Sequence, residues 1–191
     1  MAFIVGAIAI GLGTGTSSVT SRLFGSRELD QIQRITTHAA LLALLIGGCV
    51  LILGLNTIHP LFLLLGANET TLPLIEQYMS IYYFASFFLI VPMIGNSVLR
   101  ASGDVKTPSY LMMAGALLNV VLDPIFIFGW GPIPRMESEG AALATVLANA
   151  ITGSMSIGVI YFRDHLIRWK STDVSLLIDS WRRILHVGVP S

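Results

Sequence analysis

The segment Leu117–Trp130, which reads LLNVVLDPIFIFGW, places the carboxylate of Asp123 inside an apolar run that begins near Ser109. Asn119 precedes this aspartate by four residues, and Pro124 follows it directly. A charge in the hydrocarbon core of a membrane costs a few kcal/mol on insertion scales, so carboxylates there are rare and commonly functional. The run therefore predicts a membrane-spanning helix whose aspartate binds and releases a cation during transport.

The whole chain has the composition of a membrane protein. Hydrophobic residues make up 54% of the 191 residues, charged residues make up 12%, and the mean hydropathy is +0.77. Soluble domains carry roughly a quarter charged residues, whereas apolar runs of about 18 or more residues predict membrane-spanning helices. We therefore expect an all-α, polytopic transmembrane bundle with five spans, at about 1–21, 36–58, 78–99, 107–130 and 140–162.

The basic residues predict how this bundle is oriented in the cell (cytoplasmic) membrane. Of the 11 Lys and Arg residues, all except Arg135 flank alternate loops, and the positive-inside rule assigns those loops to the cytoplasm. The formal net charge is zero, which gives no indication of a nucleic-acid partner. Cys49 is the only cysteine, so no disulfide within the chain is expected.

The two ends of the chain suggest a longer protein. No basic residue precedes the first apolar block, so its amino terminus is expected outside, where an earlier helix would have carried it. Residues 164–183 mix charges with Trp and Leu, which predicts a cytoplasmic interfacial linker; a solvated linker with a short helix is the alternative. Residues 184–191 are expected to begin a further transmembrane helix. We interpret the chain as roughly one structural half of a longer protein.

Asn119 and Asp123 form the centre of a candidate cation site. Residues four apart share a helix face, about 6 Å apart along the axis. Pro124 has no backbone N–H, so it frees the carbonyl of Val120 to serve as an oxygen ligand beside the carboxylate. We predict that Asp123 takes up a proton or a sodium ion, with Asn119 as a second sodium ligand. The structural alternative is that Asp123 satisfies backbone groups around the proline break.

Two more polar residues are candidates for the same site. Thr145 lies one to two turns into the next span and could reach across to it, although Thr also commonly bonds to its own helix backbone. Tyr78 lies near the outer end of its span, where an aromatic anchor at the membrane interface is the usual role. His38 and His59, at the edges of the second span, are expected to snorkel or cap rather than carry protons.

The motifs NSVLRASGD (96–104), LLNVVLDPIFIFGW (117–130) and EGAALATVLAN (139–149) together resemble the amino-terminal lobe of the multidrug and toxic compound extrusion (MATE) family. The segments GLGTGTSSVTSRLFGSRE (11–28) and ILHVGVPS (184–191) are similar to other parts of that lobe. The resemblance covers nearly the whole chain. It places the chain over helices two to six of the family fold and the start of helix seven.

The resemblance implies two six-helix lobes that export organic, often cationic, compounds by alternating access, in exchange for protons or sodium ions. It implies that Asn119, Asp123 and Thr145 belong to the cation site, with Tyr78 as the least secure match. It also implies that the acidic residue of helix one lies outside this chain, and that a carboxy-terminal lobe completes the transporter. The expected partners are thus membrane lipid, small organic cations, the coupling ion and that second lobe.

Three other functions are alternatives to drug export. A lipid-linked oligosaccharide flippase of the same superfamily needs a cationic cavity, and the predicted spans contain no mid-membrane Lys or Arg. A membrane-embedded phosphotransferase needs clustered aspartates with metal-binding spacing, and no such spacing is found. A non-transporting assembly subunit would not depend on Asp123. The sequence contains no phosphate-binding loop and no nucleophile elbow, so we expect neither an enzyme nor a cofactor.

Overall fold

The computed structural model describes residues 2–68, 70–130, 134–167 and 174–188. This part of the chain forms α-helices and one short π-helical segment, and it contains no strand. The elements are α1 (Ala2–Ser26), α2 (Leu29–Leu64), α3 (Leu72–Ala101), α4 (Lys106–Phe128), α5 (Glu137–Gly158), the π-helical η1 (Val159–Arg163) and α6 (Val174–Gly188). The predicted all-α fold is confirmed.

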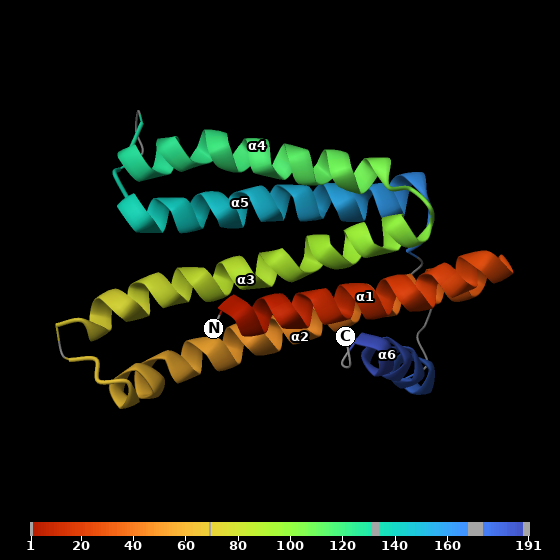
Figure 1. The fold of residues 1–191 in the computed structure, drawn as a ribbon, viewed down its shortest axis with the longest axis horizontal. Helices are drawn as coiled ribbons and strands as arrows, with labels where there is room; N and C mark the ends of the chain where they lie inside the picture. The colour runs from red at the N-terminus through yellow and green to blue at the C-terminus, as the bar shows by residue number, and fades with distance from the viewer. Residues whose placement is uncertain (1, 69, 131–133, 168–173, 189–191) are drawn as a thin grey trace.

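Consecutive long helices run antiparallel, with α3 at the centre of the bundle. α3 packs against α1, α2 and α5, while α4 packs chiefly against α5. Figure 1 shows α4 and α5 as a pair on one side of α3, with α1 and α2 on the other side. The short α6 packs on α1 and α2. The α1–α2 and α3–α4 turns share one end of the bundle in Figure 1, so the arrangement agrees with the predicted alternation of basic loops.

Four segments are long and apolar enough to cross a membrane: Leu29–Leu64, Leu72–Ala101, Lys106–Phe128 and Glu139–Arg163. They correspond to the predicted spans 36–58, 78–99, 107–130 and 140–162, and they confirm a multi-pass membrane protein. The first two are longer at both ends than the hydropathy of the sequence suggests. The fifth predicted span, 1–21, forms α1; it is not among these four in the described part of the chain, so its membrane crossing stays a prediction.

Two clusters of buried side chains hold the bundle together. One joins α1, α2, α3 and α6, and the other joins α2, α3 and α4 with η1 and the residues after it. The first consists of Ala9, Leu12, Ala39, Leu42, Ala43, Ile90, Ile94 and Ile184, and the second of Ile32, Val98, Leu99, Leu111, Ile160 and Leu166. Every helix except α5 therefore contributes to a cluster, and α3 takes part in both.

Small residues allow α1 and α6 to approach each other backbone to backbone. A Cβ atom added at Gly11 would lie 2.7 Å from the carbonyl oxygen of Gly188, and one at Gly15 would collide with the carbonyl of Ile184. Trp181 Nε1 donates a hydrogen bond of 2.9 Å to the carbonyl of His38, which ties α6 to α2. The small-residue pair that the sequence contains is thus a packing surface for α6.

The helix at the carboxy-terminal end of the described chain does not begin or end at the predicted domain boundary. The predicted boundary between an interfacial linker (164–183) and a further span (184–191) falls inside α6, which is continuous from Val174 to Gly188. The assignment of these two parts to interface and membrane stays a prediction, and residues 168–173 and 189–191 lie outside the described residues. The π-helical turn η1, at the end of the last long span, was not expected from the sequence.

Candidate functional site

The helix pair α4–α5 positions most of the predicted site residues. Asn119 and Asp123 are half-buried on α4, one turn apart, as their spacing predicts. α4 and α5 approach closely at both ends of this region: a Cβ atom at Gly115 would lie 3.0 Å from Thr152, and one at Gly140 would lie 2.5 Å from the backbone of Phe126. These two glycines therefore bring the polar groups of α4 within reach of α5.

Asn119 and Thr145 meet between the two helices. Asn119 Nδ2 donates a hydrogen bond of 3.3 Å to Thr145 Oγ1, and that hydroxyl donates one of 3.0 Å to the carbonyl of Ala141. Both predicted roles of Thr145 are thus present, since it bonds to its own helix and also reaches across to α4. The Asn119 amide oxygen stays available because the bond to Thr145 uses only the amide nitrogen.

Asp123 carries a buried oxygen atom without a hydrogen-bond partner. Its Oδ1 is inaccessible to solvent and forms no hydrogen bond with any described residue. Pro124 follows within α4 and cannot donate to the carbonyl of Val120. Buried polar atoms in proteins nearly always have a partner. The unpaired, buried oxygen of Asp123 is therefore the feature of this helix pair that is left for an explanation by a bound proton or cation.

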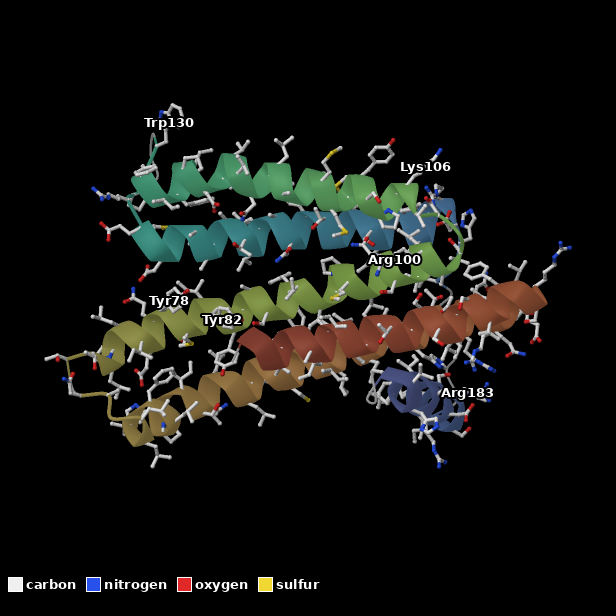
Figure 2. The ribbon with its side chains drawn as sticks, in the orientation of Figure 1. Tyr78, Tyr82, Arg100, Lys106, Trp130 and Arg183 are labelled. Carbon is white, nitrogen blue, oxygen red and sulfur yellow. The ribbon has the colours of Figure 1, made fainter. Side chains whose placement is uncertain are left out.

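Tyr78 lies on a different helix from the other three candidates. It is near the amino-terminal end of α3 and is 44% exposed (Figure 2). Within the described part of the chain it forms no hydrogen bond to Asn119, Asp123 or Thr145, so its place in the site stays a prediction. No group of three His, Cys, Asp or Glu side chains among the described residues could hold a metal ion. A sodium site here would have to use amide, hydroxyl and carbonyl oxygens together with the single carboxylate.

A cavity of about 320 Å³ opens one helical turn away from Asn119 and Thr145, between α3, α4 and α5. We call it the α3–α4–α5 cavity. Its lining residues are Leu89, Pro92, Met93, Asn96, Arg100, Leu111, Met112, Gly115, Ala116, Asn149 and Thr152. Sequence reasoning missed this cavity, and the signal that could have indicated it is the arginine at the end of the predicted span 78–99.

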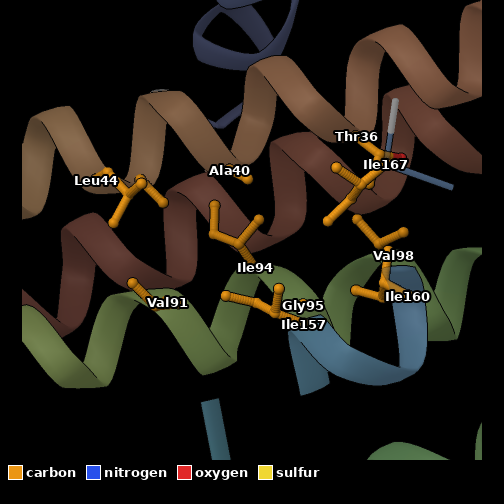
Figure 3. A pocket seen from close by; sticks show the side chains of 11 residues that line it. Thr36, Ala40, Leu44, Val91, Ile94, Gly95, Val98, Ile157, Ile160 and Ile167 are labelled. Atoms are coloured by element: carbon orange, nitrogen blue, oxygen red, sulfur yellow. The ribbon is translucent and has the colours of Figure 1, made fainter. Parts of the chain in front are cut away.

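A second, smaller cavity of about 40 Å³ lies between α2, α3 and α5. Figure 3 shows that its wall is made almost entirely of aliphatic side chains, among them Leu44, Ile94 and Ile160, with Thr36 at one end. The buried hydroxyl of Thr36 has no hydrogen-bond partner in the described structure. This space has neither the volume nor the polar groups to bind a substrate.

A clamp of charged residues holds the start of α4 and the end of η1, which follows α5, together. The Asp104 carboxylate accepts hydrogen bonds from the Thr107 hydroxyl (2.6 Å) and backbone N–H (2.9 Å), which caps α4. Arg163, at the end of η1, contributes a further bond of 2.6 Å to the same carboxylate and also pairs with Asp164. The Thr107 hydrogen bonds, with Arg163 next, hold the pKa of Asp104 well below its usual range.

Comparison with known proteins shows which family this chain belongs to. The family model described as MatE matches residues 1–125. The FAD transporter of Shewanella oneidensis is 37% identical over 188 residues, which is 98% of this chain and 42% of that protein. The multidrug export protein MepA of Staphylococcus aureus is 30% identical over 160 residues, 82% of this chain and 34% of that protein.

The fold comparison agrees with the sequence comparison. A solved structure described as the outward-facing conformation of a multidrug resistance MATE family transporter of the MOP superfamily superposes with a TM-score of 0.83 at 31% identity. The match covers 97% of this chain and 41% of that structure. The chain thus spans less than half the length of these relatives, which are transporters rather than enzymes. From its sequence, its fold and its membrane-spanning helices, the chain belongs to the MatE family of multi-pass membrane transporters.

Proposed function

We propose that this chain forms one lobe of an antiporter that exports organic compounds across the cell membrane in exchange for protons or sodium ions. The observation that carries the proposal is the buried Oδ1 of Asp123, which has no partner among the described residues. A carboxylate in that position is stabilised when a proton or a cation binds to it. Neutralisation by the coupling ion is therefore the simplest use of this residue.

The neighbouring oxygens favour a site that accepts either ion. A proton needs only the carboxylate of Asp123. A sodium ion needs several oxygen ligands, and the Asn119 amide oxygen, the Thr145 hydroxyl and the Val120 carbonyl are the candidates. Thr145 donates its proton to Ala141, so its oxygen can take part as an acceptor.

Coupling follows if the ion and the exported compound bind differently to the two conformations of the lobe. In the outward-open state, uptake of the ion neutralises Asp123 and weakens the attraction for a cationic compound, which is released. The ion-loaded protein then turns inward, loses the ion and regains affinity for the next molecule. Tight binding of the ion alone would not shift the equilibrium between the two conformations. Only a difference in affinity between the two states changes their populations.

A second substrate class is favoured by a relative. The Shewanella oneidensis protein, 37% identical over 98% of this chain, is named as an FAD transporter. We therefore keep an anionic dinucleotide as an alternative cargo to an organic cation. Both proposed cargo classes use the same ion site on α4, and they differ in the charge of the compound that the lobe carries.

The test is an Asp123→Asn variant of the full-length transporter, assayed in proteoliposomes under an imposed proton or sodium gradient. We expect normal expression and near-complete loss of gradient-driven export, because the amide cannot bind or release the coupling ion. Asp179→Asn is the matched control, since Asp179 is exposed on α6 and, among the described residues, pairs with Arg183. Wild-type export by the Asp123→Asn protein would overturn the assignment.

A further inference from the structure

The α3–α4–α5 cavity contains a cation that no carboxylate neutralises. Arg100 Nη2 donates a hydrogen bond of 3.0 Å to Ser97 Oγ, and in the described part of the chain Arg100 forms no ion pair. The cavity wall includes neither Asp nor Glu. By contrast, Arg163 at the same end of the bundle is paired with both Asp104 and Asp164. The guanidinium of Arg100 therefore leaves the cavity with a net positive charge.

Arg100 lies where two cavities meet. Another cavity, of about 160 Å³ between α1 and α3, is also lined by Arg100 and Met93. Figure 2 shows Arg100 near the end of α3, close to the turn that leads to Lys106. An arginine presents five N–H donors, and the bond to Ser97 occupies only part of them. The remaining donors are available to an anionic group that enters either cavity.

The other polar residues of the cavity suit the same kind of ligand. Asn96 Oδ1 accepts a hydrogen bond of 3.4 Å from Ser156, which leaves the Asn96 Nδ2 group as a donor. Asn149 supplies a second amide, whereas Leu89, Met93 and Met112 supply apolar surface. Methionine side chains adapt well to flat aromatic rings. The cavity wall thus combines hydrogen-bond donors for an anionic group with apolar surface for the hydrophobic part of the same ligand.

We propose that this cavity binds the anionic end, a phosphate or a carboxylate, of an amphipathic organic anion, with Arg100 as the principal charge contact. The proposal rests on the proposed function of the lobe as a carrier, and it favours the anionic alternative cargo named there over the organic cation. A volume of about 320 Å³ is near the lower end of the range for small-molecule pockets, about 300–1,000 Å³. It accommodates one charged group and one ring rather than a whole dinucleotide.

The cavity adjoins the candidate ion site along the same two helices. Gly115 of the cavity precedes Asn119 by four residues, and Asn149 follows Thr145 by four. The two sites are therefore about one helical turn, or about 6 Å, apart along α4 and α5. Any relative movement of α4 and α5 changes both sites together, which links the binding of the ion to that of the anion.

The test measures the binding of riboflavin, FMN and FAD to the purified full-length transporter in phosphatidylcholine nanodiscs. These probes share one ring system; riboflavin has no phosphate, FMN has one, and FAD has two phosphates and an adenosine, so the comparison of riboflavin with FMN isolates the phosphate. We expect Arg100→Gln to weaken FMN and FAD binding about tenfold, as the loss of a charge-assisted hydrogen bond implies, and to leave riboflavin binding unchanged. Arg100→Lys should restore part of the affinity. Lys106→Gln is the control, because Lys106 is a nearby cation that does not line the cavity.

The outcomes separate this inference from the proposed function. Equal losses for all three flavins, or no loss for any, would overturn the anion site. Displacement of FMN by added phosphatidylglycerol would support the site and identify a lipid headgroup as the source of the anion. Asp123→Asn should keep the binding series intact while export is lost. If Asp123→Asn exports normally, the ion site is wrong, and the flavin series still decides the anion site.

Discussion

Gly140 is the position where one added methyl group should disturb the candidate ion site most directly. It lies in the first turn of α5, against the end of α4. An alanine Cβ there would lie 2.5 Å from the carbonyl carbon and oxygen of Phe126 and 2.8 Å from the nitrogen of Ile127. Ordinary contacts begin at 3.4 Å, so the two backbones must separate by about 0.9 Å. Backbone atoms in a helix cannot rotate away as a flexible side chain can.

The separation should also displace Thr145, which lies five residues further along α5. The Asn119–Thr145 hydrogen bond is 3.3 Å long, already beyond the usual range of about 2.7–3.2 Å, and a further displacement would break it. Overpacking costs about 1–3 kcal/mol, and the lost hydrogen bond adds about 0.5–1.5 kcal/mol. The better helix propensity of alanine offsets up to about 1 kcal/mol. We expect Gly140→Ala to lower the free energy of unfolding by about 1–3 kcal/mol.

The assay is thermal unfolding in detergent, followed by tryptophan fluorescence, together with gradient-driven export. Gly158→Ala is the matched control on the same helix, because a Cβ atom at Gly158 meets nothing within 4 Å. We expect the Tm of Gly140→Ala to fall by several degrees and its coupled export to drop, while Gly158→Ala stays at or slightly above the wild type. If both variants unfold at the same temperature and export equally well, the close packing of α4 on α5 is not what positions the site.

Two further predictions concern residues at either end of the same helix pair. Thr145→Ala removes the acceptor of the Asn119 hydrogen bond, so the affinity for the coupling ion, measured by isothermal titration, should fall several-fold, and Thr145→Ser should recover most of it. Asp104→Asn should lower the Tm at neutral pH, because the depressed pKa of Asp104 means that its ionised form stabilises the fold. That stabilisation is fully present above the unfolded-state pKa of about 4 and is lost as the pH falls through the lower folded-state value. The Tm difference between wild type and Asp104→Asn should therefore shrink in strong acid, and a constant difference would contradict the clamp formed with Thr107 and Arg163.

The positions of the spans could be predicted because the signal is local. An apolar run of sufficient length has to satisfy its own backbone hydrogen bonds in lipid, and a helix does so within one segment. The break between the predicted spans 78–99 and 107–130 is also present, and Gly103 lies in it with a φ of +91°, a conformation that favours glycine. The boundary predicted between residues 183 and 184 falls inside α6, because a change of polarity along a sequence does not by itself end a helix.

The site was predicted in part. Asn119 and Asp123 share a face because they are four residues apart on one helix, and no knowledge of the rest of the fold is needed for that. The sequence could not show that Arg100 would line a cavity without a carboxylate. It also could not show that Asp104 would be held by Arg163, which lies 59 residues further along the chain.

The sequence by itself determined that the chain is a membrane-embedded helical bundle, which loops carry the basic residues, and which helix holds the buried acid. Only the tertiary structure decided that Asn119 contacts Thr145 and that Gly140 packs against the α4 backbone. It also decided that α6 packs on Gly11 and Gly15. The physical reason is that helix formation in lipid depends on hydrogen bonds between neighbours in the chain. The contacts between helices depend instead on which surfaces pack together, and distant parts of the chain supply them.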